Sequence, residues 1–93
     1  MPVTVTFGSF EWDKEKAALN VKRHGITFYT AVLVFLDPKR ILAVDKLHSE
    51  TEPRHFCIGK AGNEIATVRF TLLGKRIRIN GAGYYRLARS SVG

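Results

Sequence analysis

Three arginines in the last third of the chain are spaced like side chains that share one face of a β-sheet. Arg69 follows an apolar residue in an alternating segment, and Arg76 and Arg78 flank Ile77 in the next one. Successive strand side chains point to opposite faces, so a hairpin of these segments places the three guanidinium groups together. Such a cluster repels itself unless an anion lies among its members. A bound phosphodiester is one such anion. The alternative is that the arginines form ion pairs with a carboxylate of the same chain, such as Glu52.

A carboxylate and an arginine in the preceding segment could carry out acid–base chemistry on a phosphodiester. Glu52 and Arg54 are two positions apart and therefore lie on one face of a strand. Glu52 is a candidate general base for a ribose hydroxyl, and Arg54 and Arg78 are candidates to stabilise the charge that develops at phosphorus. RNA supplies its own nucleophile, the 2′-oxygen, so this reaction needs no metal. The alternative is that Glu52 only forms an ion pair with Arg54 or Arg69.

A second group of polar side chains follows helical spacing near the N-terminus. Lys16, Asn20 and His24 are separated by four residues each and fall near one stripe of a helix. Histidine is the side chain most often used for proton transfer near neutral pH, so His24 is a candidate proton carrier. A histidine before Gly25 is equally compatible with a simple helix C-terminus, where a cation interacts favourably with the helix dipole. Lys22 adds phosphate-binding charge near the same end.

The remaining histidines and aromatic residues give weaker indications. His24, His48 and His55 match no compact metal-ligand spacing, even with the acidic residues near them. We therefore predict no metal and no cofactor. Trp12 is suited to packing under the first helix more than to base stacking. Tyr84 is suited either to stacking on a base or to packing the end of the chain onto the core.

The distribution of charge also points to a polyanion. The 93 residues include 15 basic and eight acidic side chains, a net charge of +7. Residues 65–93 hold six of the basic side chains and no acidic one, so nine basic and eight acidic residues leave residues 1–64 with +1. A one-sided positive surface is typical of nucleic-acid binding, and a role in solubility is the alternative.

Composition limits the class of protein further. The length fits a single domain, residues 1–93. Cys57 is the only cysteine, so neither an internal disulfide nor a thiolate zinc site is possible within the chain, and its apolar neighbours predict a core position. The chain has no signal-peptide pattern and no segment apolar enough to span a membrane. We therefore expect a cytoplasmic protein.

The order of the elements predicts an α+β domain. Asp13 and Thr27 are suited to cap two helices, which Gly25 and Asp37–Pro38 would end. The expected strands and helices are strand 3–10, helix 14–23, a helix from residue 28 to Asp37, and strands 40–45, 52–59, 64–71 and 76–80. Two N-terminal helices followed by a strand meander give an α+β fold of about four to five strands. Residues 81–93 are expected to form a loop or a short terminal helix.

The order of several motifs resembles the BrnT toxin family. The resemblance covers roughly residues 7–86, nearly the whole chain. Its motifs here are Phe10–Glu11–Trp12–Asp13, Lys22–Arg23–His24–Gly25–Ile26, Asp37–Pro38, Glu52 with Arg54, and Arg76–Ile77–Arg78–Ile79. Each motif is weak alone, and the ordered set is fairly specific.

This resemblance implies a RelE-like fold with two helices on a curved antiparallel sheet. It implies a metal-independent endoribonuclease that halts translation. It also implies a higher-order complex with a DNA-binding antitoxin, BrnA. The segment Gly81–Ala82–Gly83–Tyr84 departs from the Ser-Ala-Arg segment of many members. A non-catalytic nucleic-acid binder, or an inactive toxin relic that still binds its antitoxin, is therefore the alternative.

Overall fold

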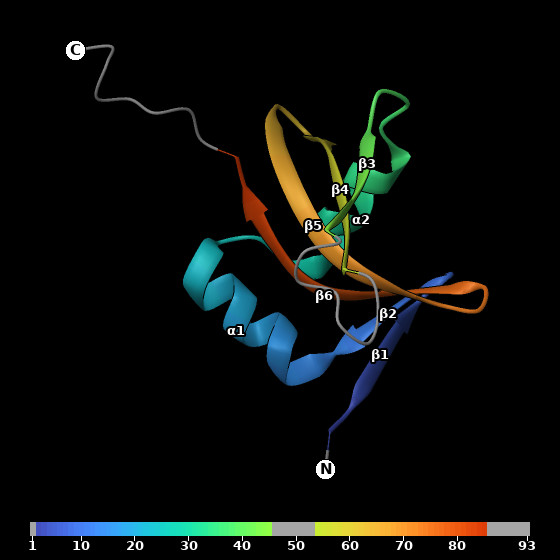
Figure 1. The fold of residues 1–93 in the computed structure, drawn as a ribbon. Coiled ribbons are helices and arrows are strands. Elements are labelled where there is room, and N and C mark those ends of the chain that lie inside the picture. Colours follow the sequence, from blue (N-terminus) through green and yellow to red (C-terminus); the bar gives the residue numbers. More distant parts are fainter. Residues whose placement is uncertain (1, 46–53, 86–93) are drawn as a thin grey trace.

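The computed structural model describes residues 2–45 and 54–85 (Figure 1). Its elements are β1 (Thr4–Phe7), β2 (Phe10–Asp13), α1 (Lys14–His24), α2 (Phe28–Leu36), β3 (Ile41–Asp45), β4 (Arg54–Ala61), β5 (Glu64–Leu73) and β6 (Arg76–Tyr84). The α+β class is confirmed. Neither described helix is long and apolar enough to cross a membrane.

The described strands form one six-stranded sheet in the order β1-β2-β6-β5-β4-β3. The prediction of four to five antiparallel strands was therefore wrong in two respects. There is one strand more than expected, and the sheet is mixed because β2 pairs with β6 in parallel. This pair joins Phe10 to Ile77 and Glu11 to Arg78, from opposite ends of the chain, and no local pattern predicts such a contact. The likeness to RelE-type toxins stays a prediction.

The single strand expected over residues 3–10 is instead a hairpin. β1 and β2 pair antiparallel, with Phe7 opposite Phe10 and a two-residue turn between them. Gly8 makes this turn with a positive φ of 59°, a conformation that glycine adopts at little cost. The turn explains why the alternation of apolar residues is loose across this segment.

Both helices begin and end close to the predicted residues because their ends carry local signals. Asp13 accepts a hydrogen bond from the Glu15 amide (2.8 Å) at the start of α1. Gly25 ends α1 in the left-handed region with a φ of 71°. At the start of α2, Thr27 accepts a hydrogen bond from the Thr30 amide (3.0 Å). The caps at Asp13 and Gly25 set where α1 begins and ends, and therefore which residues belong to the helix.

Helix α2 covers one face of the sheet, the inner face, which carries Cys57, Val68, Phe70 and Ile79. Trp12 is only 2% exposed and its ring contacts Phe7, Phe28 and Tyr29, which confirms its packing role. Cys57 is fully buried, as predicted, and burial raises the pKa of its thiol. The core consists of Trp12, Ile26, Phe28, Ala31, Val32, Val34, Cys57, Ala61, Ala66, Val68, Phe70, Ile79 and Ala82.

Strand β6 continues past Asn80, where a loop was predicted. Gly81, Ala82 and Gly83 pair with β5, and the register shifts by one residue between Arg69 and Phe70. This shift is a bulge in β6, at which Asn80 is the extra residue. The glycines were interpreted as loop residues, but glycine in a strand also marks a bulge or a close approach of another group. Residues 86–93, the rest of the expected tail, lie outside the described part.

Candidate functional site

A cleft of about 500 Å³ lies between α1 and the sheet. Its strand wall is the outer face, opposite α2, where Phe56, Thr67, Arg69 and Asn80 alternate with the buried residues of β4, β5 and β6. Its helix wall comes from one stripe of α1: Lys16, Leu19, Asn20, Arg23 and His24. The stripe of Lys16, Asn20 and His24 predicted from the sequence is confirmed.

The cleft is basic. Lys16, Arg23, His24 and Arg69 line it, and none of the lining residues is acidic. Within residues 2–45 and 54–85, these four side chains form no ion pair. The positive charges of Lys16, Arg23 and Arg69 are therefore not neutralised by the described part of the chain, and the cleft attracts anions.

Asn20 holds the helix wall against the sheet. Its side-chain amide donates to the carbonyl oxygens of Ile26 and Ala82 (3.0 Å each), and its Oδ1 accepts from the Ala82 amide (3.1 Å). β2 pairs with β6 only at Ile77 and Arg78. Further along β6, Asn20 provides hydrogen-bond partners for the backbone of Ala82. Asn20 is the one buried polar residue of the described chain, and all its buried side-chain atoms are hydrogen-bonded.

The position of the Arg69 side chain depends on Gly81, its partner residue on the neighbouring strand β6. Arg69 pairs with Gly81, and a Cβ built on Gly81 would lie 3.0 Å from Nη2 of Arg69. The guanidinium group thus lies over the glycine, on the side of the sheet that lines the cleft. On the other rim, His24 ends α1, and a Cβ on Gly83 would lie 4.0 Å from its Nδ1.

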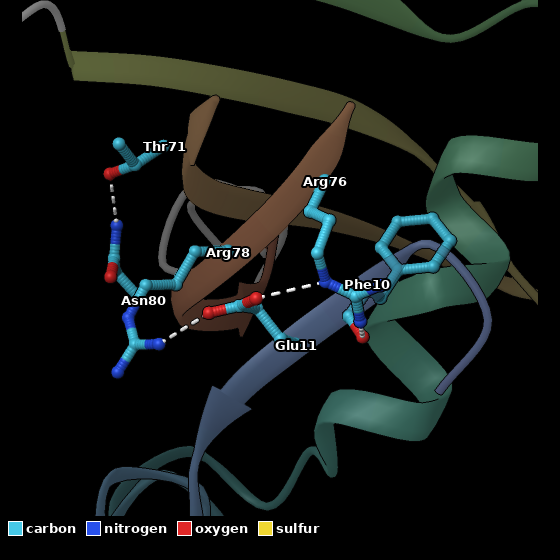
Figure 2. Close-up of polar contacts among 6 residues, drawn as sticks. All are labelled: Phe10, Glu11, Thr71, Arg76, Arg78 and Asn80. Atoms are coloured by element: carbon cyan, nitrogen blue, oxygen red, sulfur yellow. Dashed lines mark hydrogen bonds and ion pairs between the residues drawn. The ribbon is translucent and has the colours of Figure 1, made fainter. Parts of the chain in front are cut away.

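Arg76 and Arg78 share the outer face with Arg69, as the alternation predicted. Both, however, bind Glu11 of β2: Nε of Arg76 at 2.9 Å and Nη1 of Arg78 at 2.7 Å (Figure 2). The hydrogen bond from Arg78, followed by that from Arg76, holds the pKa of Glu11 below its usual value. Neither arginine lines the cleft. Glu11 is thus the acidic partner of Arg76 and Arg78, and Glu52, which the sequence suggested as a partner for these arginines, lies outside the described residues.

A cross-strand hydrogen bond joins β6 to β5 beside Arg76 and Arg78. Asn80 donates from Nδ2 to the Thr71 hydroxyl (2.8 Å), and Thr71 is the cross-strand neighbour of Arg78 (Figure 2). Arg76 also donates to the backbone carbonyl of Phe10 (3.0 Å). The arginines of β6 are therefore tied to the N-terminal hairpin and help to fix β2 beside β6.

The other residues named from the sequence lie apart from the cleft. Lys22 is exposed in the last turn of α1, and Arg54 is exposed at the start of β4, two positions before Phe56 on the same face. Tyr84 is partly buried against the core, opposite buried Ala66. Glu52 lies outside the described residues.

Phe56 and Gly81 were missed as site residues. Phe56 stands in an apolar run, Phe56–Cys57–Ile58, which was interpreted through Cys57 as core. The strand period was the available signal, because a buried Cys57 turns Phe56 to the opposite face. No comparable signal identifies Gly81, since its role depends on which residue lies opposite it. Arg23 was noted only as added charge beside Lys22.

Among the described residues, no group of three or more histidine, cysteine or acidic side chains is placed to hold a metal ion. A small basic α+β domain with an unneutralised cleft is the arrangement expected of a polyanion-binding protein.

Comparison with known families agrees with this class and is more specific. A family described as "Ribonuclease toxin, BrnT, of type II toxin-antitoxin system" matches residues 12–86, which are 75 of the 93 residues. The chain belongs to this BrnT family of ribonuclease toxins. A search of curated proteins gave no match to the chain.

Proposed function

We propose that this chain is a metal-independent endoribonuclease that cleaves RNA to inhibit translation, with the cleft beside α1 as its RNA-binding site. The observation that carries the proposal is the convergence of Lys16, Arg23, His24 and Arg69 on a cleft without acidic lining residues. An RNA phosphate is the anion that a ribonuclease toxin must bind. Arginine is suited to this role because its planar donors can bind phosphate oxygens in pairs.

The reaction follows from the chemistry of RNA. A base removes the proton of a ribose 2′-hydroxyl, and the 2′-oxygen attacks the adjacent phosphorus. The bond from phosphorus to the 5′-oxygen breaks, and that oxygen takes up a proton. The products are a 2′,3′-cyclic phosphate and a 5′-hydroxyl. No oxidant, reductant or metal enters this balance.

The proposed roles divide the site between phosphate binding and proton transfer. His24 transfers a proton at the cleft rim, and Arg69 stabilises the charge that develops at phosphorus. Glu52 remains the proposed second proton carrier. Arg54 and Arg78 lie on the outer face outside the cleft, and with Lys22 and Arg76 they are proposed to bind the RNA further along its backbone. Tyr84 is not assigned a role, because it packs against the core.

The decisive experiment is a cleavage assay with purified protein, RNA and an excess of chelator. We expect cleavage with 2′,3′-cyclic phosphate ends. Arg69→Ala should reduce the rate about 10- to 100-fold, since a hydrogen bond to a charged group contributes about 1.5–3 kcal/mol. Lys75→Ala is the matched control: it removes a positive charge from the exposed turn between β5 and β6 and should leave the rate unchanged.

Two outcomes would contradict the proposal. Binding of RNA without cleavage would support the alternative, a non-catalytic nucleic-acid binder. Equal rates for Arg69→Ala and the wild type would remove the cleft from the mechanism.

The family also implies an antitoxin partner. We infer that the partner is a DNA-binding protein of the BrnA type, encoded beside this chain. We place the activity of this chain in the cytoplasm, and its expression alone should arrest cell growth. Co-expression of the neighbouring gene should restore growth. Growth without arrest would indicate an inactive relic.

A further inference from the structure

Phe56 is an aromatic residue that does not belong to the hydrophobic core of the described residues. Its side chain lies on the outer face of β4 and lines the cleft, partly buried. The ring contacts of the described residues join β1, β2, α2 and the inner face, and Phe56 takes part in none of them. A large apolar ring that is turned away from the core into a basic cleft needs another reason for its position.

The register places this ring beside the phosphate-binding group. Phe56 pairs with Arg69, and Arg69 pairs with Gly81, so the three form one row across β4, β5 and β6. Neighbouring strands are about 4.8 Å apart, so the row spans roughly 10 Å. The guanidinium of Arg69 leans over Gly81, at the β6 end of the row. The row therefore presents an apolar surface at one end and a cation at the other.

This arrangement matches the chemistry of one nucleotide. A base is flat and stacks on aromatic rings, whereas its phosphate binds cations. The cleft volume of about 500 Å³ lies within the range of about 300–1,000 Å³ that is typical of small-ligand sites. We propose that the cleft takes an unpaired nucleotide of RNA, with its base on Phe56 and its phosphate at Arg69. This inference rests on the proposed function and adds the class of substrate.

Base pairing would prevent this mode of binding. In an A-form duplex each base is stacked between its neighbours, and the major groove is too deep and narrow for side chains to enter. The ring of Phe56 lies in a cleft walled by α1 rather than on a projecting surface, so it can reach only a base that has left the stack. The substrates are therefore single strands, loops and bulges.

Binding is best measured with 2′-O-methyl oligonucleotides, which lack the nucleophilic hydroxyl and are not cleaved. The wild type should bind an unpaired oligonucleotide more tightly than the same strand annealed to its complement. Phe56→Leu keeps an apolar side chain but removes the ring, and should weaken binding of the unpaired strand about 5- to 150-fold. Phe56→Tyr should restore affinity. Ile58→Ala, on the same strand and face but outside the cleft lining, is the matched control.

The outcomes separate this inference from the proposed function. Equal affinity of the wild type for paired and unpaired strands, or an unchanged affinity in Phe56→Leu, would overturn the inference while chelator-resistant cleavage persisted. Absence of both binding and cleavage with any RNA would overturn the proposed function itself. Comparison of paired and unpaired strands on the wild type requires no variant, so the inference stays testable if Phe56→Leu fails to fold.

Discussion

At the scale of single residues, the cleft depends on Gly81, because this residue has no side chain. Gly81 leaves the space over β6 that the Arg69 guanidinium occupies. The backbone of Gly81 has no positive φ, so alanine fits the strand, and the cost falls on the arginine. The glycine is therefore a positioning residue for Arg69.

We expect Gly81→Ala to weaken RNA binding by displacing Arg69, by less than Arg69→Ala does. The two substitutions should not be additive, because both act through the same guanidinium group. Affinities for a 2′-O-methyl oligonucleotide in the four variants of a double-mutant cycle measure this coupling. Full additivity would show that Gly81 acts independently of Arg69.

Glu11 determines a different property, the response of the fold to acid. Its pKa is lowered mainly by the hydrogen bond from Arg78 and then by that from Arg76. A lowered pKa in the folded state means that the stabilisation is present above the unfolded value near 4.5 and is lost as the pH falls through the folded value.

Glu11→Gln should therefore lower the melting temperature at pH 7, and the difference from the wild type should shrink below about pH 4.5. Thermal melts from pH 7 to pH 2.5 would check this. A difference that stays constant over this range would show that Glu11 stabilises the protein by packing rather than by charge.

At the scale of elements, Asn20 joins α1 to the edge of β6. Replacing it leaves buried backbone groups of Ile26 and Ala82 without partners. Each unsatisfied buried group costs about 1–3 kcal/mol. The position of the helix wall, and with it the width of the cleft, depends on these bonds.

Asn20→Ala should lower the free energy of unfolding by about 3 kcal/mol or more, because three buried backbone groups lose a partner, and it should weaken RNA binding as well. Val21→Ala, at the exposed neighbouring position, should change stability by less than about 0.5 kcal/mol. Urea denaturation measures both. A stable Asn20→Ala variant would mean that other contacts hold α1 in place.

The elements that the sequence predicts well are those with local signals. Asp13, Gly25 and Thr27 mark the helix ends through contacts with residues a few positions away. The missed features depend on distant partners: the parallel pairing of β2 with β6 and the extension of β6 through Gly81 and Gly83. Glycine is common in loops and also at strand positions that another group approaches closely. Only the tertiary structure distinguishes these two cases.

The candidate site divides in the same way. His24 and Arg69 were predicted and line the cleft, because helix and strand periods place them. The alternation also placed Arg76 and Arg78 on the correct face. It could not predict that Glu11 binds both, since this carboxylate comes from the other end of the chain.

At the scale of the whole molecule, the net charge of +7 dominates encounters with RNA. The cleft offers three to four cationic contacts, each of which releases a counterion on binding. The logarithm of the association constant should fall with the logarithm of salt concentration with a slope of about −2 to −3, at about −0.7 per contact.

Arg69→Ala should reduce the magnitude of that slope by about 0.7, and Lys75→Ala should leave it nearly unchanged. Titrations between 50 and 300 mM salt, on the order of the physiological range, would measure it. A steep slope unaffected by Arg69→Ala would place the RNA on another basic surface.

The bonds from Asn20 to Ala82 have a consequence for synthesis. The helix wall of the cleft, α1, is synthesised well before the strand β6 that Asn20 binds. A nascent chain that stops before residue 82 lacks Ala82, the residue of β6 to which Asn20 of α1 is hydrogen-bonded. The contacts that join α1 to β6 therefore cannot form until β6 has been synthesised.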